Sequence, residues 1–309
     1  YQIGQSENKI QLSRTAFLLT LAINGATNDF GARPGDPLNM TVNFKNAGKT
    51  SLKNASIALK LDAPALKRVS IMDWVELSDQ LDGDIVGKQI NDNLRNGTIT
   101  WNKSKLKDLG EIKSSQEVSL DLRLPIKGAD KINLSEIKEN QIKATAEIIF
   151  TDEDKTQKTI ASNPITITLN SDFTFEKRVE VTKTNDDKDK RNFTWILRNT
   201  FHPLKDIVLS AEVYGDVEFI TSTIPAGKLN YDSKEKIINW TIDEMPESVD
   251  VLALPFSLMI NKKNPTQQVL LSKIKIKATD KVTDQIITFM GSETLLFEEK
   301  TEEEDPFAR

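Results

Sequence analysis

The sequence contains no cysteine and only one histidine, His202, in 309 residues. Without cysteine the chain can form neither disulfides nor thiolate metal sites. One histidine in a loop beside Pro203 does not make a nucleophilic triad or a histidine metal site, because these need further Ser, Cys or His side chains nearby. We therefore expect His202 to be a solvated turn residue, and we expect no enzymatic activity, no cofactor and no tightly bound metal.

Long apolar runs and concentrated charge are also missing. The longest apolar run, at residues 16–23, is too short to cross a bilayer, and no signal-peptide pattern is visible. Since the chain begins at Tyr1, we expect any export signal or membrane anchor to lie outside it. The 41 basic and 46 acidic residues are interspersed and give a net charge of −5, so no basic stripe predicts a nucleic-acid partner.

What the sequence does contain is apolar residues at every second position. Leu38, Met40, Val42 and Phe44 are the clearest case, and a spacing of two places all four on one face of a strand. Similar short segments recur along the chain with Gly, Pro, Asn and Asp between them. This pattern predicts an all-β protein made of two tandem immunoglobulin-like antiparallel β-sandwich domains.

The two domains are indicated by a repeat, since residues 39–61 and 192–213 have the same pattern of two strands around a polar loop. Further landmarks keep their order while their separation drifts, which is typical of a duplicated domain with loop insertions. We expect Trp101 and Trp240 to be equivalent core residues. The aligned pairs are Leu52 and Leu204, Trp101 and Trp240, Pro125 and Pro255, and Ile142 and Ile276.

The expected boundaries follow from this alignment. Residues 1–15 form a lead-in or edge strand, 16–170 the first domain, 171–298 the second, and 299–309 an acidic disordered tail. Leu295–Phe297 is expected to close the second domain as Ile165–Leu169 closes the first. The junction at residues 170–172 lacks a Gly-Ser or Pro-rich tether, so we expect a semi-rigid rod.

The segment Lys67–Asn96 has no counterpart of equal length in the second copy, and we expect it to carry the contact surface. A short helix is predicted near Met72–Leu81. The candidate contact residues are Trp74, Asp79, Asp82 and Asp84.

Two alternatives remain open for these candidates. Trp74 is either an exposed contact or a cap over the end of the sandwich, and the cap is favoured. The acidic loops at 79–84, 152–154 and 186–189 offer oxygen ligands of the kind that Ca²⁺ prefers, but none has the spacing of an EF-hand. Charged hairpin tips are the default on a β-protein, so this explanation is favoured over a Ca²⁺ site.

A family resemblance rests on a set of turns and one tryptophan. The turn Pro34-Gly35-Asp36 leads into the strand at 38–46, and Leu52–Asn54, Trp101, Leu109–Glu111 and the strand at 118–124 follow. This order resembles the conserved-repeat, cell-adhesion-related (CARDB-like) domains of bacterial and archaeal surface proteins. Gly110-Glu111 lacks the preceding Pro of that family, and the second copy has no Pro-Gly-Asp turn. The resemblance implies an immunoglobulin-like sandwich outside the cytoplasm and transfers no binding site.

The leading functional hypothesis is therefore a non-enzymatic extracytoplasmic protein, a spacer or adhesive module of a cell-surface or envelope assembly. Its expected partners are other surface or envelope proteins, or glycans. The alternative is a carbohydrate-binding or accessory module of an envelope enzyme, which clustered exposed aromatics would favour. Only 6% of the residues are aromatic, and most occupy core-facing positions of the predicted strands, which argues against this alternative.

Overall fold

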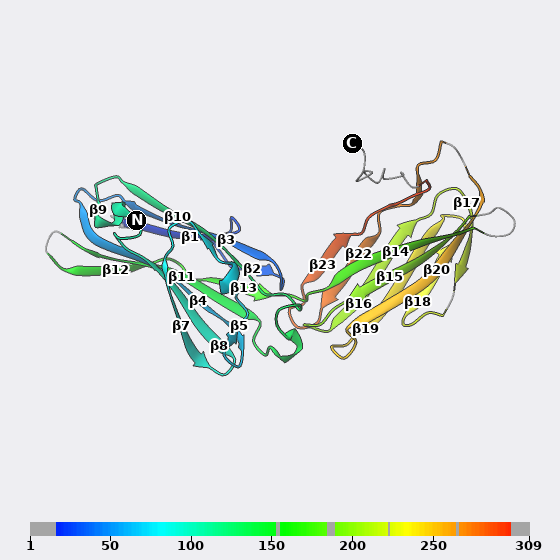
Figure 1. Ribbon diagram of the computed structural model, residues 1–309, viewed down its shortest axis with the longest axis horizontal. Coiled ribbons are helices and arrows are strands. Elements are labelled where there is room, and N and C mark those ends of the chain that lie inside the picture. Colours follow the sequence, from blue (N-terminus) through cyan, green and yellow to red (C-terminus); the bar gives the residue numbers. More distant parts are fainter. Residues whose placement is uncertain (1–16, 153–154, 184–188, 222, 264–265, 298–309) are drawn as a thin grey trace, which may run out of the picture. The chain divides into compact units, whose positions relative to one another are not determined.

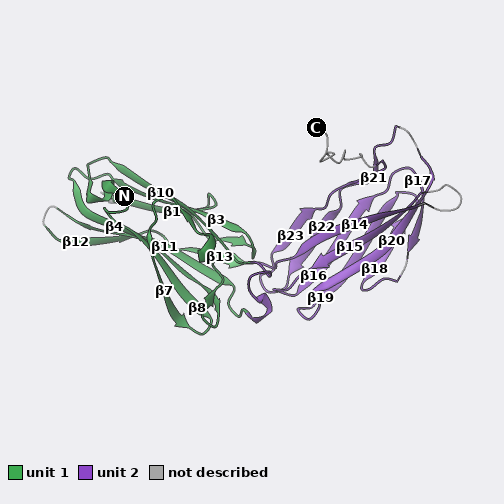
Figure 2. Ribbon diagram, viewed as in Figure 1, with its two compact units in different colours: residues 1–127, 137–169 green, residues 128–136, 170–309 purple. Residues whose placement is uncertain are grey.

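The period-two apolar pattern forms β-strands throughout the computed structural model, which describes residues 17–152, 155–183, 189–221, 223–263 and 266–297. The described chain is all-β apart from three short 3₁₀ helices: η1 (Trp74–Glu76), η2 (Lys107–Gly110) and η3 (Leu134–Glu136). It divides into two compact units, residues 1–127 with 137–169 and residues 128–136 with 170–309 (Figures 1 and 2). The expected lead-in 1–15 and tail 299–309 lie outside the described residues.

The first unit is built from two sheets. One sheet has the order β1 (Phe17–Ile23), β3 (Pro37–Asn46), β10 (Glu117–Pro125), β6 (Ser78–Asp79). The other has the order β2 (Phe30–Ala32), β13 (Ile165–Leu169), β11 (Gln141–Thr151), β4 (Leu52–Leu66), β8 (Leu94–Trp101), β7 (Asp84–Asn91). Three short strands join it: β12 (Gln157–Ala161) on β11, and β5 (Val69–Ser70) and β9 (Glu111–Ile112) on β4. Pairing is antiparallel except between β2 and β13.

The core of the first unit lies between these sheets. The four alternating residues of β3, Leu38 to Phe44, are buried as the pattern predicts. Phe17 and Phe44 of one sheet contact Phe150 of the other, with ring centroids 5.1 and 6.3 Å apart. Apolar side chains meeting between two antiparallel sheets are the defining feature of a β-sandwich.

The second unit repeats this arrangement. One sheet has the order β14 (Thr174–Lys183), β15 (Asp189–Arg198), β20 (Val251–Lys262), β17 (Asp216–Thr221). The other has the order β18 (Lys228–Asp232), β19 (Ile237–Met245), β16 (Leu204–Glu212), β22 (Lys275–Asp280), β23 (Ile286–Met290). A small sheet pairs β21 (Val269–Leu271) with β24 (Thr294–Leu295). The predicted fold class, immunoglobulin-like antiparallel β-sandwiches, is confirmed.

The two tryptophans expected to be equivalent occupy matching positions in the sheets. Trp101 lies opposite Ile57 of β4, and Trp240 lies opposite Leu209 of β16, the residue aligned with Ile57 in the repeat. Both indoles are fully buried. The same sheet registers, however, do not support two of the other landmarks.

The strand pairing shifts these two landmarks. Glu117 lies opposite Lys45 and Val251 opposite Arg198, so Pro255 sits at the level of Asp121 rather than of Pro125. Likewise Ile276 pairs with Leu209 as Ile148 pairs with Ile57, not as Ile142 does. Short apolar strands can be aligned over four residues in many ways. Only the hydrogen-bonded register of the strands decides which positions are equivalent.

Two local expectations were wrong. The helix predicted near Met72–Leu81 is only the three-residue η1, and the chain then turns through β6 into the hairpin of β7 and β8. The expected closing strand at Leu295–Phe297 is only the two-residue β24, which pairs with β21, while β23 forms the edge of the sheet. No helix in the described ranges is long and apolar enough to span a membrane.

Candidate functional site

Asp79, a predicted contact residue, is part of the internal bonding of the first unit. Its Oδ2 accepts a hydrogen bond from the indole N–H of Trp101 at 2.8 Å and one from the backbone N–H of Gly83 at 2.8 Å. Its Oδ1 accepts the N–H of Leu81 at 3.0 Å. A side chain on Gly83 would collide with the Trp101 indole, since an added Cβ would lie 2.6 Å from Nε1. Asp79 therefore holds the turn that leads into β7.

The other two acidic candidates share one lysine. Nζ of Lys105 lies 3.1 Å from Asp84 and 3.8 Å from Asp82. The hydrogen bond to Asp84 is the main cause that raises the pKa of Lys105. The described residues contain no group of three or more His, Cys, Asp or Glu side chains placed to hold a metal ion. The acidic loops at 152–154 and 186–189 fall partly outside the described residues.

Trp74 is half-buried and packs on the β7–β8 hairpin. A Cβ added to Gly97 of β8 would lie 2.0 Å from Cζ2 of Trp74, so the indole rests on a position that has no side chain. Gly97 pairs with Gly87 of β7, so neither residue of this pair has a side chain where the indole packs. Of the two alternatives for Trp74, this packing matches the cap.

Exposed aliphatic side chains are a further feature of the surface of this segment. Val75 of η1 is 94% exposed, and Ile85, Val86 and Ile90 of β7 are 49%, 65% and 49% exposed. β7 is the last strand of its sheet and pairs only with β8, so the side facing away from β8 is an open edge (Figure 1). We call the strand β7, with its exposed residues Ile85, Val86 and Ile90, the β7 edge.

The corresponding strand of the second unit shows that this exposure is not required by the fold. β18 is also the outer neighbour of the tryptophan strand, and Leu229 of β18 lies opposite Trp240. Its Leu229 and Tyr231 pack against the core, and the Tyr231 ring stacks on Phe219 with centroids 4.9 Å apart. Every residue of β7 except the half-buried Gln89 is exposed, so its apolar residues are available to another molecule.

His202 is not the solvated turn residue that we expected. It is 6% exposed, its Nδ1 lies 2.9 Å from Oδ2 of the fully buried Asp280, and its ring stacks on Phe201. The side chain of Asn199 donates to the His202 carbonyl at 2.7 Å. No sequence pattern indicates this partner, because Asp280 is far along the chain and lies at the end of a different strand.

The histidine and aspartate do not form a catalytic triad with the nearby serine. The Ser171 hydroxyl bonds to the Asn199 side chain, and the Ser171 backbone N–H donates to Asp280 at 2.7 Å. Burial would raise the pKa of Asp280, but the hydrogen bond and charge of His202, with the N–H groups of Thr283 and Val282, lower it below the usual aspartate range. This network ties the start of the second unit to its loops.

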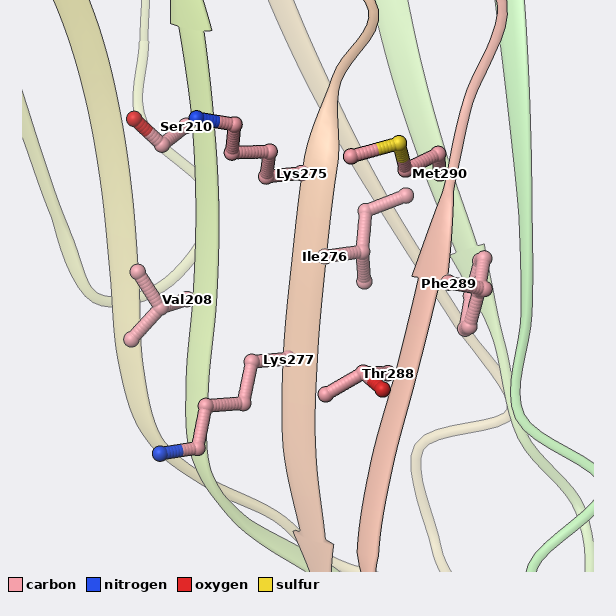
Figure 3. Close-up of a pocket in the computed structure, with 8 residues that line it drawn as sticks. All are labelled: Val208, Ser210, Lys275, Ile276, Lys277, Thr288, Phe289 and Met290. Carbon is pink, nitrogen blue, oxygen red and sulfur yellow. The ribbon is translucent and has the colours of Figure 1, made fainter.

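A second surface feature lies on the outer face of the second unit. An open groove of about 510 Å³ runs over β16, β22 and β23, lined by Val208, Ser210, Lys275, Ile276, Lys277, Thr288, Phe289 and Met290. Both lysine side chains extend toward Val208 and Ser210, while Thr288 and Met290 lie on the other side of β22 (Figure 3). No acidic side chain lines this groove among the described residues, so it offers no acid–base pair.

Comparison with known proteins adds little to this picture. No protein-family model and no curated protein sequence matches the chain. Among solved structures, the major pilin subunit of Bacillus cereus matches with 14% identity over 91% of this chain and 64% of its own, at a TM-score of 0.29. AvmM, which catalyses macrocyclization in alchivemycin A biosynthesis, matches with 9% identity over 48% of this chain and 88% of its own, at 0.32.

A cohesin is the third structure of this kind. The sixth cohesin of Acetivibrio cellulolyticus scaffoldin B, solved with a dockerin, matches with 12% identity over 50% of this chain and 99% of its own, at a TM-score of 0.27. The chain thus spans somewhat less than two thirds of the pilin subunit's length.

Proposed function

We propose that the chain is a non-enzymatic structural and interaction module of an extracytoplasmic, cell-surface or envelope assembly. The observation that carries this proposal is the β7 edge, an open strand edge whose aliphatic residues are exposed, whereas the corresponding strand of the second unit, β18, packs its Leu229 and Tyr231 against the core. An open edge can take an additional strand from another protein, which supplies backbone hydrogen bonds as well as side-chain contacts.

The polar chemistry of the chain supports the same conclusion. The one histidine is buried against Asp280, and Asp79 is occupied by Trp101 and two backbone N–H groups. These groups hold loops in place instead of facing a cleft. The extracytoplasmic location is proposed from the resemblance of residues 34–124 to conserved-repeat surface domains.

A protein partner is favoured over a glycan. Sugar-binding surfaces commonly present aromatic rings for stacking, but Trp101, Trp195 and Trp240 are fully buried and Trp74 lies on Gly97. The aliphatic residues of the β7 edge suit an apolar protein surface better. The carbohydrate-binding alternative therefore has no specific observation in its favour.

Sedimentation with isolated cell envelopes tests this proposal. The wild-type protein should sediment with envelopes of the organism that carries the gene, and Val86→Lys/Ile90→Lys should remain in the supernatant. The control Ile286→Lys/Met290→Lys changes two apolar residues of β23 that are 60% and 62% exposed, and it should sediment normally. A wild type that stays in the supernatant, or equal sedimentation of both double variants, would overturn the proposal.

A further inference from the structure

We propose that the β7 edge pairs with the β7 edge of a second copy of this chain, in an antiparallel register centred on Val86. This inference rests on the proposed function, because it names the partner of the same surface. It starts from the open edge of β7: strands of this kind pair readily with another strand unless charge, proline or a covering segment prevents it. β7 contains no proline, and no described strand lies along its outer side.

The charges of β7 are complementary to themselves about Val86. Asp84, Val86 and Lys88 lie on the outer face of the strand, opposite Thr100, Thr98 and Asn96 of β8. In an antiparallel pair centred on Val86, the two Val86 side chains are neighbours and Asp84 of each copy lies opposite Lys88 of the other. In a closed two-fold interface each contact occurs twice. The interface therefore contains two opposite-charge pairs between Asp84 and Lys88.

The free chain leaves both partners of this interface available. Lys88 is exposed and makes no ion pair with a described residue. Asp84 contacts Lys105, but its side chain is still 61% exposed, so it can receive a second cation. A register displaced along the strand would place Asp84 opposite apolar or like-charged residues, and like charges directly opposite each other are destabilising. The charges therefore select the register centred on Val86.

Sedimentation velocity over a micromolar to millimolar concentration series measures the association. The wild type should form a dimer. Asp84→Lys gives an all-positive edge and Lys88→Asp an all-negative one, so each alone should associate about tenfold more weakly. Mixed in equal amounts, these two variants should recover the dimer, because each lysine then faces an aspartate. Asp284→Lys, which changes an exposed acid of the second unit, is the matched control.

Cross-linking tests the register independently of stability. The chain has no cysteine, so a single introduced thiol reports only its own contact. Opposite residues of an antiparallel pair lie close enough for a disulfide, whereas the two Lys88 positions would be separated by four residues, about 14 Å. With copper–phenanthroline as the oxidant, Val86→Cys should form a covalent dimer rapidly and Lys88→Cys should not.

The outcomes separate this inference from the proposed function. A monomer at all concentrations overturns the self-pairing, and equal cross-linking of Val86→Cys and Lys88→Cys overturns the register. If the protein is monomeric yet Val86→Lys/Ile90→Lys loses envelope binding, the β7 edge has a different protein partner. In that case the proposed function stands and the self-pairing falls.

Discussion

The indole nitrogen of Trp101 lies 2.8 Å from a carboxylate oxygen of Asp79, and this hydrogen bond joins the core of the first unit to the turn before β7. The bond gives Asp79 a structural role that its position in an acidic loop did not reveal. Since the turn orients the β7 edge, the stability of the core and the geometry of the proposed contact surface are linked through these two residues.

Substitutions in the acidic loop should therefore have unequal effects. Asp79→Ala leaves the Trp101 N–H and two backbone N–H groups without their acceptor, and should lower the free energy of unfolding by about 1–3 kcal/mol. Asp82→Asn should change it by less than about 0.5 kcal/mol, because the Asp82 side chain is 98% exposed and asparagine tolerates the positive φ of 51° at this position. Urea unfolding of both variants measures the difference. Equal effects would contradict the role given to Asp79.

Removal of either core tryptophan should destabilise its own unit. Trp101→Ala and Trp240→Ala each leave a large cavity at a fully buried position, and each should cost about 3–5 kcal/mol. Chemical denaturation should show one unit unfolding earlier while the other is unchanged. Val86→Ala, an exposed control, should stay within about 0.5 kcal/mol of the wild type. A loss below about 1 kcal/mol at both tryptophans would show that the two positions do not anchor the cores.

The sequence predicted the regular parts of the fold because burial there follows a strict period. Leu38 and Phe44 of β3 face the core for the reason that the pattern indicated, and the match of Trp101 with Trp240 agrees with the strand registers. The matches at Pro255 and Ile276 did not agree, since sliding a strand by an even number of residues keeps the same face buried. Only hydrogen-bonded pairing could distinguish these registers.

The sequence singled out contact candidates by residue type, without the internal partners that the fold gives some of them. Trp74 and Asp79 stood out by residue type, yet each has an internal partner, Gly97 and Trp101, that no local pattern predicts. Ile85 and Val86 are consecutive, so alternation could not show that both would be exposed. His202 illustrates the same limit, because its partner Asp280 comes from a strand far along the chain.

The stability of the second unit should fall in acid because of Asp280. The pKa of Asp280 is lowered in the folded state, so its contribution is present above the unfolded value of about 3.9 and is lost as the pH falls through the folded pKa. Asp280→Asn should cost about 1–3 kcal/mol at neutral pH and flatten this acid dependence. Unfolding free energies measured from neutral pH to below about pH 3 test the change.

The control for this experiment is Asp284→Asn, which alters a carboxylate that is 78% exposed and paired with Lys205 at the surface. It should keep the acid dependence of the wild type. If the wild type and Asp280→Asn lose stability in parallel as the pH falls, other carboxylates cause the effect and the His202–Asp280 pair does not.

The two buried tryptophans of the second unit should respond differently to phenylalanine, although both are fully buried. The indole N–H of Trp240 donates to the Ala226 carbonyl at 2.8 Å, whereas the N–H of Trp195 has no hydrogen-bond partner among the described residues. Trp195 lies instead among aromatic rings, with Phe256 edge-on at 5.1 Å and Phe175 at 6.2 Å. A buried N–H without a partner destabilises the folded state, so removing it offsets part of the packing lost with the larger ring.

Trp195→Phe should therefore be less destabilising than Trp240→Phe by about 1–2 kcal/mol. Both changes act on the same unit and remove the same atoms, so a direct comparison of their unfolding midpoints and slopes in urea is sufficient. Equal losses, or a larger loss for Trp195→Phe, would mean that the Trp195 indole is held by its N–H after all.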